Sequence, residues 1–230
     1  MNPVQSSLHP CYPIRLGLID YEEAFALQNR LAQARIREEI QDVLLLIQHP
    51  PVVTVGKSGK IQNLLAPQVL EQRKIKVIPT DRGGDVTYHG PGQLVVYPIF
   101  NIRSHGLSVP GYVWHLEETV IRLVARFGIA ARRIEKLRGV WVGNEKIAAL
   151  GVHLSRWVSK HGLALNVNTD LSPFALINPC GTGRQATSMA KILGRELSME
   201  EMESEMLQTF AEVFRLSFRQ DPLPSLESYR

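Results

Sequence analysis

One stretch of the chain reads RGGDVTYHGPGQL, from Arg82 to Leu94. Four glycines fall within ten residues of it. They give the backbone conformations that side chains forbid, and they let a ligand lie directly against the main chain. The segment that follows, Leu94 to Phe100, is apolar, β-branched and aromatic, which predicts a buried strand. We therefore expect a rigid, core-anchored loop that carries Arg82, Tyr88 and His89, although a plain glycine-rich turn between two strands would have the same composition.

The rest of the chain alternates between helical and strand patterns. Apolar spacing and capping residues predict helices at 21–39, 67–73, 109–127 and 199–216. Apolar and β-branched runs predict strands at 14–18, 43–47, 52–55, 76–80, 139–142, 146–152, 157–158 and 161–167, with a tight hairpin turn at Gly143-Asn144. This order favours an α+β fold, a single domain whose mixed, largely antiparallel sheet is flanked by helices. We expect a flexible segment over 1–13, the domain over 14–218, and a loose tail over 219–230.

Composition narrows the class of protein. The chain has 230 residues, 44% of them hydrophobic and 21% charged, which suits one globular domain. Its 26 basic against 22 acidic residues give a net charge of +4, which is weak support for nucleic-acid binding and suits an acidic protein partner equally well. Two cysteines, a polar start and no long apolar run favour the cytoplasm, without export or membrane insertion. No metal-ligand spacing or phosphate-loop motif occurs, so we expect neither a metal nor a nucleotide.

Cys180 is the candidate nucleophile. It lies between Pro179 and Gly181 in a segment without periodicity, whereas a passive cysteine is more typical of a strand or helix. A nucleophilic cysteine must be a thiolate near pH 7, which needs a cation, a histidine or a helix N-terminus nearby. The candidates are Lys146, His89, His153 and His161. A cation ~4 Å away at an effective dielectric of ~20 contributes roughly 4 kcal/mol, enough to lower the thiol pKa by up to about three units.

Lys146 is the preferred partner of Cys180. It lies where the predicted hairpin turn meets an apolar strand, so we expect its side chain to be held in place, although an exposed turn lysine would fit the same position. A third segment, His161 to Asn166, joins a histidine and a glycine to apolar residues. It could line a groove for an apolar ligand, and a core strand with a hydrogen-bonded histidine is the alternative.

Three sets of residues resemble the octanoyltransferases of lipoate synthesis, also called lipoyl(octanoyl) transferases. They are Arg82 to Leu94; Lys146 to Gly151 together with His161 to Asn166; and Pro179-Cys180-Gly181. The resemblance extends from about residue 15 to 214, with the motifs in the family's order and usual spacing. It implies a fold similar to that of lipoate and biotin protein ligase catalytic domains.

The resemblance also implies an acyltransferase that needs no cofactor. It would move octanoyl from octanoyl-acyl carrier protein to a lysine of lipoyl domains, those of 2-oxoacid dehydrogenase complexes and the glycine cleavage H protein. Cys180 would form the acyl thioester and Lys146 would lower its pKa, while Lys146 or His161 could take the proton of the incoming amine. The acyl site would be lined by Arg82, Gly83, Gly84, Asp85, Val86, Thr87, Tyr88, His89, Ala149, Leu150, Gly151, Gly162, Leu163 and Ala164.

Three rival functions fit parts of the same sequence. An ATP-dependent lipoate or biotin protein ligase would make an acyl-adenylate and would not need Cys180. A non-catalytic acyl- or nucleic-acid-binding domain would keep its binding when Cys180 is replaced. A cysteine hydrolase would pass the acyl group to water instead of an amine.

Overall fold

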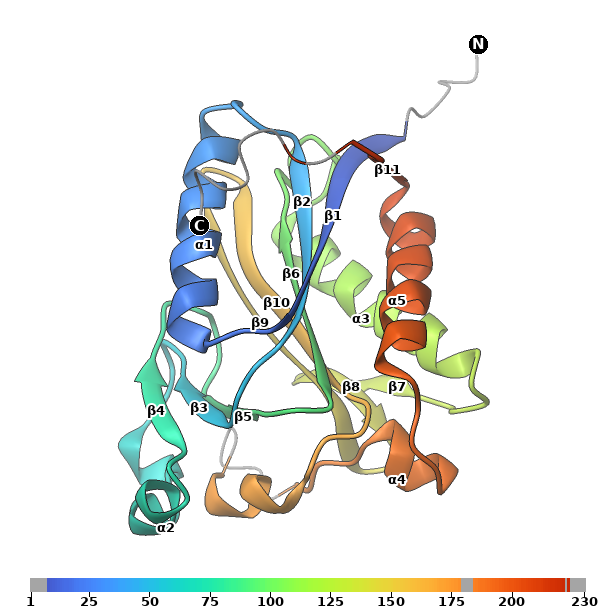
Figure 1. Cartoon of the computed structure of the whole chain (residues 1–230). Coiled ribbons are helices and arrows are strands. Elements are labelled where there is room, and N and C mark those ends of the chain that lie inside the picture. Colours follow the sequence, from blue (N-terminus) through green and yellow to red (C-terminus); the bar gives the residue numbers. More distant parts are fainter. Residues whose placement is uncertain (1–7, 179–183, 222, 224–230) are drawn as a thin grey trace.

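The structure is a computed structural model of the chain, and it describes residues 8–178, 184–221 and 223. A sheet of eight strands crosses the centre, with α1 (Tyr21–Ile36) on one face and α3 (Val109–Ala125) and α5 (Met199–Phe214) on the other (Figure 1). A smaller sheet and α2 (Pro67–Gln72) lie together at the lower left of that view. Helices therefore flank the main sheet on both faces.

The main sheet is mixed and mostly antiparallel. Its strand order is β11-β1-β2-β6-β10-β9-β8-β7, and only β11 with β1 and β1 with β2 run parallel. Its strands are β1 (His9–Leu18), β2 (Asp42–Gln48), β6 (Gln93–Ile99), β7 (Arg132–Ile134), β8 (Leu137–Val142), β9 (Glu145–Ser155), β10 (Val158–Asn166) and β11 (Leu216–Phe218). The predicted α+β class with a largely antiparallel sheet is confirmed.

The small sheet has the order β4-β3-β5 and carries the glycine-rich stretch. It consists of β3 (Val52–Val55), β4 (Lys76–Pro79) and β5 (Val86–His89). The stretch from Arg82 to Leu94 is thus a bend, the short strand β5, a second turn and the start of β6, instead of one loop. Because β5 pairs with β3, the hydrogen bonds between these two strands fix the residues that lie between Gly84 and Gly90.

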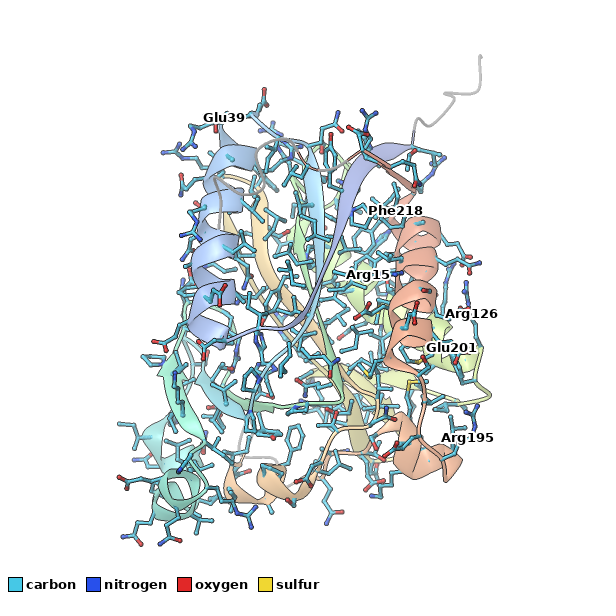
Figure 2. The ribbon with its side chains drawn as sticks, viewed as in Figure 1. Arg15, Glu39, Arg126, Arg195, Glu201 and Phe218 are labelled. Atoms are coloured by element: carbon cyan, nitrogen blue, oxygen red, sulfur yellow. The ribbon has the colours of Figure 1, made fainter. Side chains whose placement is uncertain are left out.

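Two hydrophobic cores explain the unbroken apolar run in β2. Leu44 and Leu46 pack with α3 and α5 on one face of the sheet, while Leu45 and Ile47 pack with α1 on the other. A strand that is buried on both faces has no polar alternation, as the sequence predicted. Between the layers, Arg15 reaches from β1 to α5, where its guanidinium donates to Ser204 Oγ at 3.1 Å (Figure 2).

The helices α1 and α5 begin where the sequence predicted, but both end earlier than predicted. Asp20 accepts from the Glu22 N–H and Ser198 accepts from the Glu201 N–H at the starts of α1 and α5. Helix α1 ends at Ile36, three residues early, because Glu38 has a φ of 60°. Arg215 has a φ of 58° and turns the chain out of α5 into β11.

The terminal and connecting elements show the remaining differences. Strand β1 begins at His9 instead of at residue 14, and its early part pairs with β11, which the sequence pattern missed. The predicted strands at 157–158 and 161–167 are one strand, β10. The short elements η1 (Ile61–Asn63), η2 (Ser172–Leu176), α4 (Met189–Leu193) and β7 were not predicted. The division at residues 13 and 218 stays a prediction.

Candidate functional site

A large cavity runs between β9–β10 of the main sheet and the small sheet with η2. Its volume is about 1340 Å³, above the roughly 300–1,000 Å³ of sites for one small molecule. Of the predicted site residues that the structure describes, all but Tyr88 and the alternative cation His153 line it: Arg82, Gly83, Gly84, Asp85, Val86, Thr87, His89, Lys146, Ala149, Leu150, Gly151, His161, Gly162, Leu163 and Ala164. The fold thus brings segments from across the chain to one cavity.

Tyr88 has a different place. Its side chain is 3% exposed and packs in the core of the small sheet, edge-on to Phe174. Its ring also folds back over Gly90, where any Cβ would overlap the Tyr88 hydroxyl. Burial raises the pKa of Tyr88 to about 12. Tyr88 therefore supports the wall of the cavity from behind instead of lining it.

Small residues form a floor under the cavity. Ala149 pairs with Ala164 and Gly151 pairs with Gly162 across β9 and β10. These four positions form one block in which no side chain extends beyond a methyl group. We call this block the small-residue floor. A linear apolar chain could lie along it in contact with the sheet.

The bend before β5 closes one end of the floor. The Gly83 N–H donates to the Val152 carbonyl at 2.9 Å, and a Cβ on Gly151 would come within 2.7 Å of the Gly83 oxygen. Gly84 has a φ of +92°, a conformation that favours glycine. The glycines at 83, 84 and 151 thus let two backbones meet directly.

Arg82 begins a chain of buried hydrogen bonds behind the cavity. Its guanidinium donates to the Thr54 hydroxyl from Nε at 3.1 Å, and to the Thr54 carbonyl at 2.7 Å. His89 Nε2 lies 3.4 Å from that hydroxyl, and His89 Nδ1 lies 2.7 Å from Gln93 Oε1. Burial holds the pKa of His89 well below its usual range, so the ring is neutral. With the amide oxygen as acceptor, Nδ1 carries the proton and Nε2 accepts from the Thr54 hydroxyl.

The chain continues toward Lys146. Gln93 Nε2 donates to Asn166 Oδ1 at 2.9 Å, and Asn166 Nδ2 donates to the Thr187 carbonyl at 2.9 Å. The Thr187 N–H in turn donates to the Lys146 carbonyl at 2.9 Å. A continuous set of hydrogen bonds therefore connects Arg82 at one end of the cavity with the backbone of Lys146 at the other.

Lys146 is held as the sequence predicted. Its ammonium lies 4.8 Å from the centre of the buried Trp141 ring, and its N–H donates to the Gln185 carbonyl at 2.9 Å. Gly139, with a φ of +114°, makes room for its stem, because a Cβ there would lie 3.2 Å from Lys146 Cε. Cation–π contact and backbone pairing fix the lysine at the cavity, instead of leaving it exposed in a turn.

Cys180 lies outside the described residues. The described residues on either side, Asn178 and Arg184, both line the cavity. The Asn178 N–H donates to the Asn63 carbonyl at 2.8 Å, while Ala186 forms a bridge with Lys146. The chain thus enters the undescribed segment at the cavity and leaves it beside Lys146. The second cysteine, Cys11, is buried in the main sheet, and burial raises its thiol pKa well above the usual range.

His161 lies far from Lys146. It pairs with Val152, six residues from Lys146 along β9, so the backbones of the two residues are roughly 20 Å apart at about 3.4 Å per residue. Its φ of 56° breaks the alternation of β10, so Lys160 and His161 both reach Asp81, at 2.8 and 2.6 Å. This separation argues against His161 as the acceptor of a proton released beside Lys146.

Asp81 is contacted by three basic side chains at that end of the cavity. His161, with its pKa lowered by burial, presents its Nε2–H to one carboxylate oxygen. Lys160 donates to the other, with His153 Nε2 3.8 Å away. The hydrogen bond from His161, with further contributions from Lys160, holds the pKa of Asp81 well below its usual range. The carboxylate is therefore ionised at neutral pH.

Several cavity residues were missed by the sequence reasoning. Tyr21, Tyr97 and Trp141 line the cavity, and Asp81 and Thr54 hold its residues from behind. Two had a local signal, since Asp81 directly precedes Arg82 and Trp141 lies opposite Lys146 across the hairpin. Among the described residues, no group of three or more His, Cys, Asp or Glu side chains could hold a metal ion. None of the described helices is both long and apolar enough to span a membrane.

Comparison with known proteins points to one family. Residues 20–211 match the family model of the lipoyl protein ligase A/B catalytic domain. The chain is 51% identical over 205 residues to the octanoyltransferase of Solibacter usitatus, covering 89% of this chain and 93% of that protein. It is 45% identical to the octanoyltransferase of Caldicellulosiruptor saccharolyticus, covering 92% and 91%.

Solved structures show the same fold at low identity. Lipoate-protein ligase A bound with ATP superposes with a TM-score of 0.74 at 15% identity, over 96% of this chain and 92% of that one. The biotin protein ligase of Aquifex aeolicus, in complex with biotin and ATP, has a TM-score of 0.55 at 14% identity, over 89% and 70%. The expected likeness to lipoate and biotin ligases is confirmed at the level of the fold.

Proposed function

The chain belongs to the octanoyltransferases of the lipoyl protein ligase A/B family, and from that membership we propose how it carries out octanoyl transfer in protein lipoylation. The donor is octanoyl-acyl carrier protein, and the acceptor is a lysine of a lipoyl domain, in 2-oxoacid dehydrogenase complexes or the glycine cleavage H protein. The octanoyl group passes through a thioester on Cys180, in the cytoplasm. One observation carries this proposal: a small-residue floor leads to a held lysine, Lys146, and the residues on both sides of the cysteine segment line the same cavity.

In the first step, the Cys180 thiolate attacks the carbonyl carbon of the donor thioester. A carbon–sulfur bond to Cys180 forms, and the bond to the carrier's sulfur breaks. Lys146 takes the thiol proton and returns it to the departing carrier thiolate. One thioester replaces another, so the step needs no ATP.

In the second step, the neutral amine of the acceptor lysine attacks the Cys180 thioester. An amide bond forms, and the bond between the acyl carbon and Cys180 breaks. The amine proton passes to Lys146 and then to the released thiolate, which restores the starting state. An amide is more stable than a thioester, and this difference drives the transfer forward.

The cavity suits an apolar chain attached to a polar carrier. The acyl chain lies on the small-residue floor, where each buried methylene contributes roughly 0.8 kcal/mol. The remaining volume accommodates the arm that delivers the chain. Four basic residues line the cavity and are exposed: Lys136, Arg138, Arg184 and Lys191. We call them the basic rim, and they suit an acidic carrier protein.

Intact-mass spectrometry tests the proposal. The protein is mixed with octanoyl-acyl carrier protein without ATP, and then with a lipoyl domain. We expect an octanoyl adduct that maps to Cys180 and disappears when the lipoyl domain is added. Cys180→Ser should lose both the thioester adduct and the transfer, whereas the matched variant Cys11→Ser should keep both, because Cys11 is buried outside the cavity.

Three other results would point elsewhere. Transfer that requires ATP and continues in Cys180→Ser would indicate the ligase chemistry of the structural relatives. Release of free octanoate without acylation of the lipoyl domain would indicate a hydrolase. Unaltered octanoyl binding by Cys180→Ser, with no transfer by the wild type, would indicate a binding domain.

A further inference from the structure

Buried polar side chains line the end of the cavity opposite Lys146. Tyr21, Arg82, Tyr97 and His161 all line the cavity there and are 2%, 7%, 3% and 1% exposed. We call these four residues the polar end wall. Arg82 lies against Gly151 and His161 directly precedes Gly162, where the floor meets the bend that carries Gly83. An apolar chain that starts near Lys146 and follows the floor therefore ends against these four side chains.

Each member of the wall is fixed by a hydrogen bond from behind. The Tyr97 hydroxyl bonds with His49 Nε2 at 3.0 Å, and the Tyr21 hydroxyl donates to Thr80 Oγ1 at 3.1 Å. His161 is held by Asp81 at 2.6 Å, and Arg82 is held by Thr54. Moving any of these side chains would leave a buried polar atom without its partner.

The rings of the wall also pack against one another and their neighbours. The Tyr97 and His161 rings meet edge-on with centroids 6.0 Å apart, and His161 stacks on Phe25 of α1 at 5.5 Å. Tyr21 lies 5.2 Å from the ring of His49, which also bonds Tyr97. The wall is therefore a connected, close-packed unit that resists a small displacement.

We propose that the polar end wall sets the maximum length of the acyl chain that the enzyme transfers. This inference rests on the proposed function and adds the residues that select its substrate. Each methylene on the floor strengthens binding about fourfold, or ~0.8 kcal/mol. A methylene that must displace a wall side chain breaks a buried hydrogen bond, which weakens binding by about 5- to 150-fold, or 1–3 kcal/mol. The second effect is the larger, so binding improves with chain length only until the chain reaches the wall.

The test compares donors of different length in wild type and in Tyr97→Leu. The donors are carrier proteins loaded with six-, eight-, ten- and twelve-carbon chains. We expect kcat/KM of the wild type to fall at least tenfold beyond the preferred length. Tyr97→Leu should raise the ratio of ten-carbon to eight-carbon transfer at least tenfold. Tyr12→Leu is the matched control, because Tyr12 is a buried tyrosine on the same side of the sheet that does not line the cavity.

Two outcomes would overturn the inference. One is a folded Tyr97→Leu that transfers octanoyl with the wild-type length profile. The other is a wild type that uses twelve-carbon donors as well as eight-carbon donors. If Tyr97→Leu does not fold, Tyr21→Leu opens the same wall from α1 and replaces it.

A binding measurement keeps the inference separate from the proposed function. Calorimetry with free fatty acids of six to twelve carbons measures the length limit without any transfer. A wild type that transfers no acyl group, yet binds fatty acids with a limit that Tyr97→Leu extends, would contradict the transfer mechanism and support the wall. A wild type that transfers the acyl group but shows no length limit, neither in transfer nor in fatty-acid binding, would support the mechanism and contradict the wall.

Discussion

His161 Nε2 lies 2.6 Å from Asp81 Oδ1, and the two residues come from segments eighty positions apart in the chain. Lys160 Nζ lies 2.8 Å from the other carboxylate oxygen. Neighbouring residues in a regular strand point to opposite faces, so this double contact depends on the left-handed φ of His161. One irregular residue in β10 thus joins the main sheet to the bend that closes the cavity.

We expect Asp81→Asn to destabilise the fold by about 1–3 kcal/mol at pH 7, because Lys160 and His161 lose their anion while remaining buried. The pKa of Asp81 is lowered in the folded state. The ionised carboxylate therefore stabilises the fold above the unfolded pKa near ~3.9, and this stabilisation is lost as pH falls below that value. The free energies of unfolding of wild type and variant, measured with urea, should therefore differ at pH 7 and approach each other toward pH 2. Glu39→Gln, in an exposed pair with Arg37, is the control and should change little. An equal difference at both pH values would contradict the ionised pair.

A second pH effect comes from His49 behind Tyr97. His49 Nδ1 donates to the Ile19 carbonyl at 2.8 Å, and burial lowers its pKa to about 4. The folded state therefore binds this proton less readily than the unfolded state, whose pKa is near ~6.5. The neutral His49 ring therefore stabilises the folded state fully above about pH 6.5. This stabilisation, up to ~3 kcal/mol, is lost as pH falls from about 6.5 to about 4.

Urea unfolding between pH 4 and pH 8 checks the contribution of His49. His49→Gln should be less stable than wild type at pH 8, and its stability should fall less steeply on acidification. His115→Gln serves as the control, because His115 lies on α3 away from the cavity. Parallel pH curves for wild type and His49→Gln would show that another group, such as the buried His89, causes the acid dependence.

Local sequence patterns predicted most of the fold. Alternation, capping residues and turn glycines identified α1, α2, α3, α5 and most of the strands, because each pattern reports the burial of its own segment. Strand β11 and the early part of β1 were missed because they are stabilised by pairing with each other. Short polar segments such as His9 and Pro10 carry no local apolar signal, so only the tertiary contact makes them a strand.

The candidate site was predicted where glycine or reactive chemistry marked it. Arg82, Lys146 and the small residues of β9 and β10 do line one cavity. The polar end wall was missed because Tyr21 and Tyr97 look like ordinary core residues in the sequence. Their role depends on the distance between α1, β6 and β10, which no local pattern encodes. For the same reason, the separation of His161 from Lys146 emerged only from the strand register.

Lys146→Met tests the activation of Cys180. Methionine keeps much of the apolar stem over Gly139 and removes the ammonium. We expect transfer to fall about 10²–10⁴-fold. The pH at which iodoacetamide alkylates Cys180 should also rise, because a thiolate without a nearby cation forms at higher pH. Lys76→Met, an exposed lysine paired with Glu22, should leave both unchanged. Alkylation of Lys146→Met at the wild-type rate at pH 7 would contradict the proposed pairing.

The basic rim predicts a difference between two forms of donor. Lys136 and Arg138 are exposed beside the cavity, on the β7–β8 hairpin. Replacing both with glutamate should raise KM for octanoyl-acyl carrier protein at least tenfold, because an acidic partner meets negative instead of positive charge. Octanoyl-pantetheine, which has no protein part, should be used as before. Added salt should raise the KM of the wild type for octanoyl-acyl carrier protein and should have less effect on the KM of the variant.

Arg37→Glu is the control for the basic rim, since Arg37 lies beside Glu39 at the end of α1, far from the hairpin (Figure 2). An equal loss with both donors would show that the substitutions damage the acyl site itself, and would contradict a docking role for the rim.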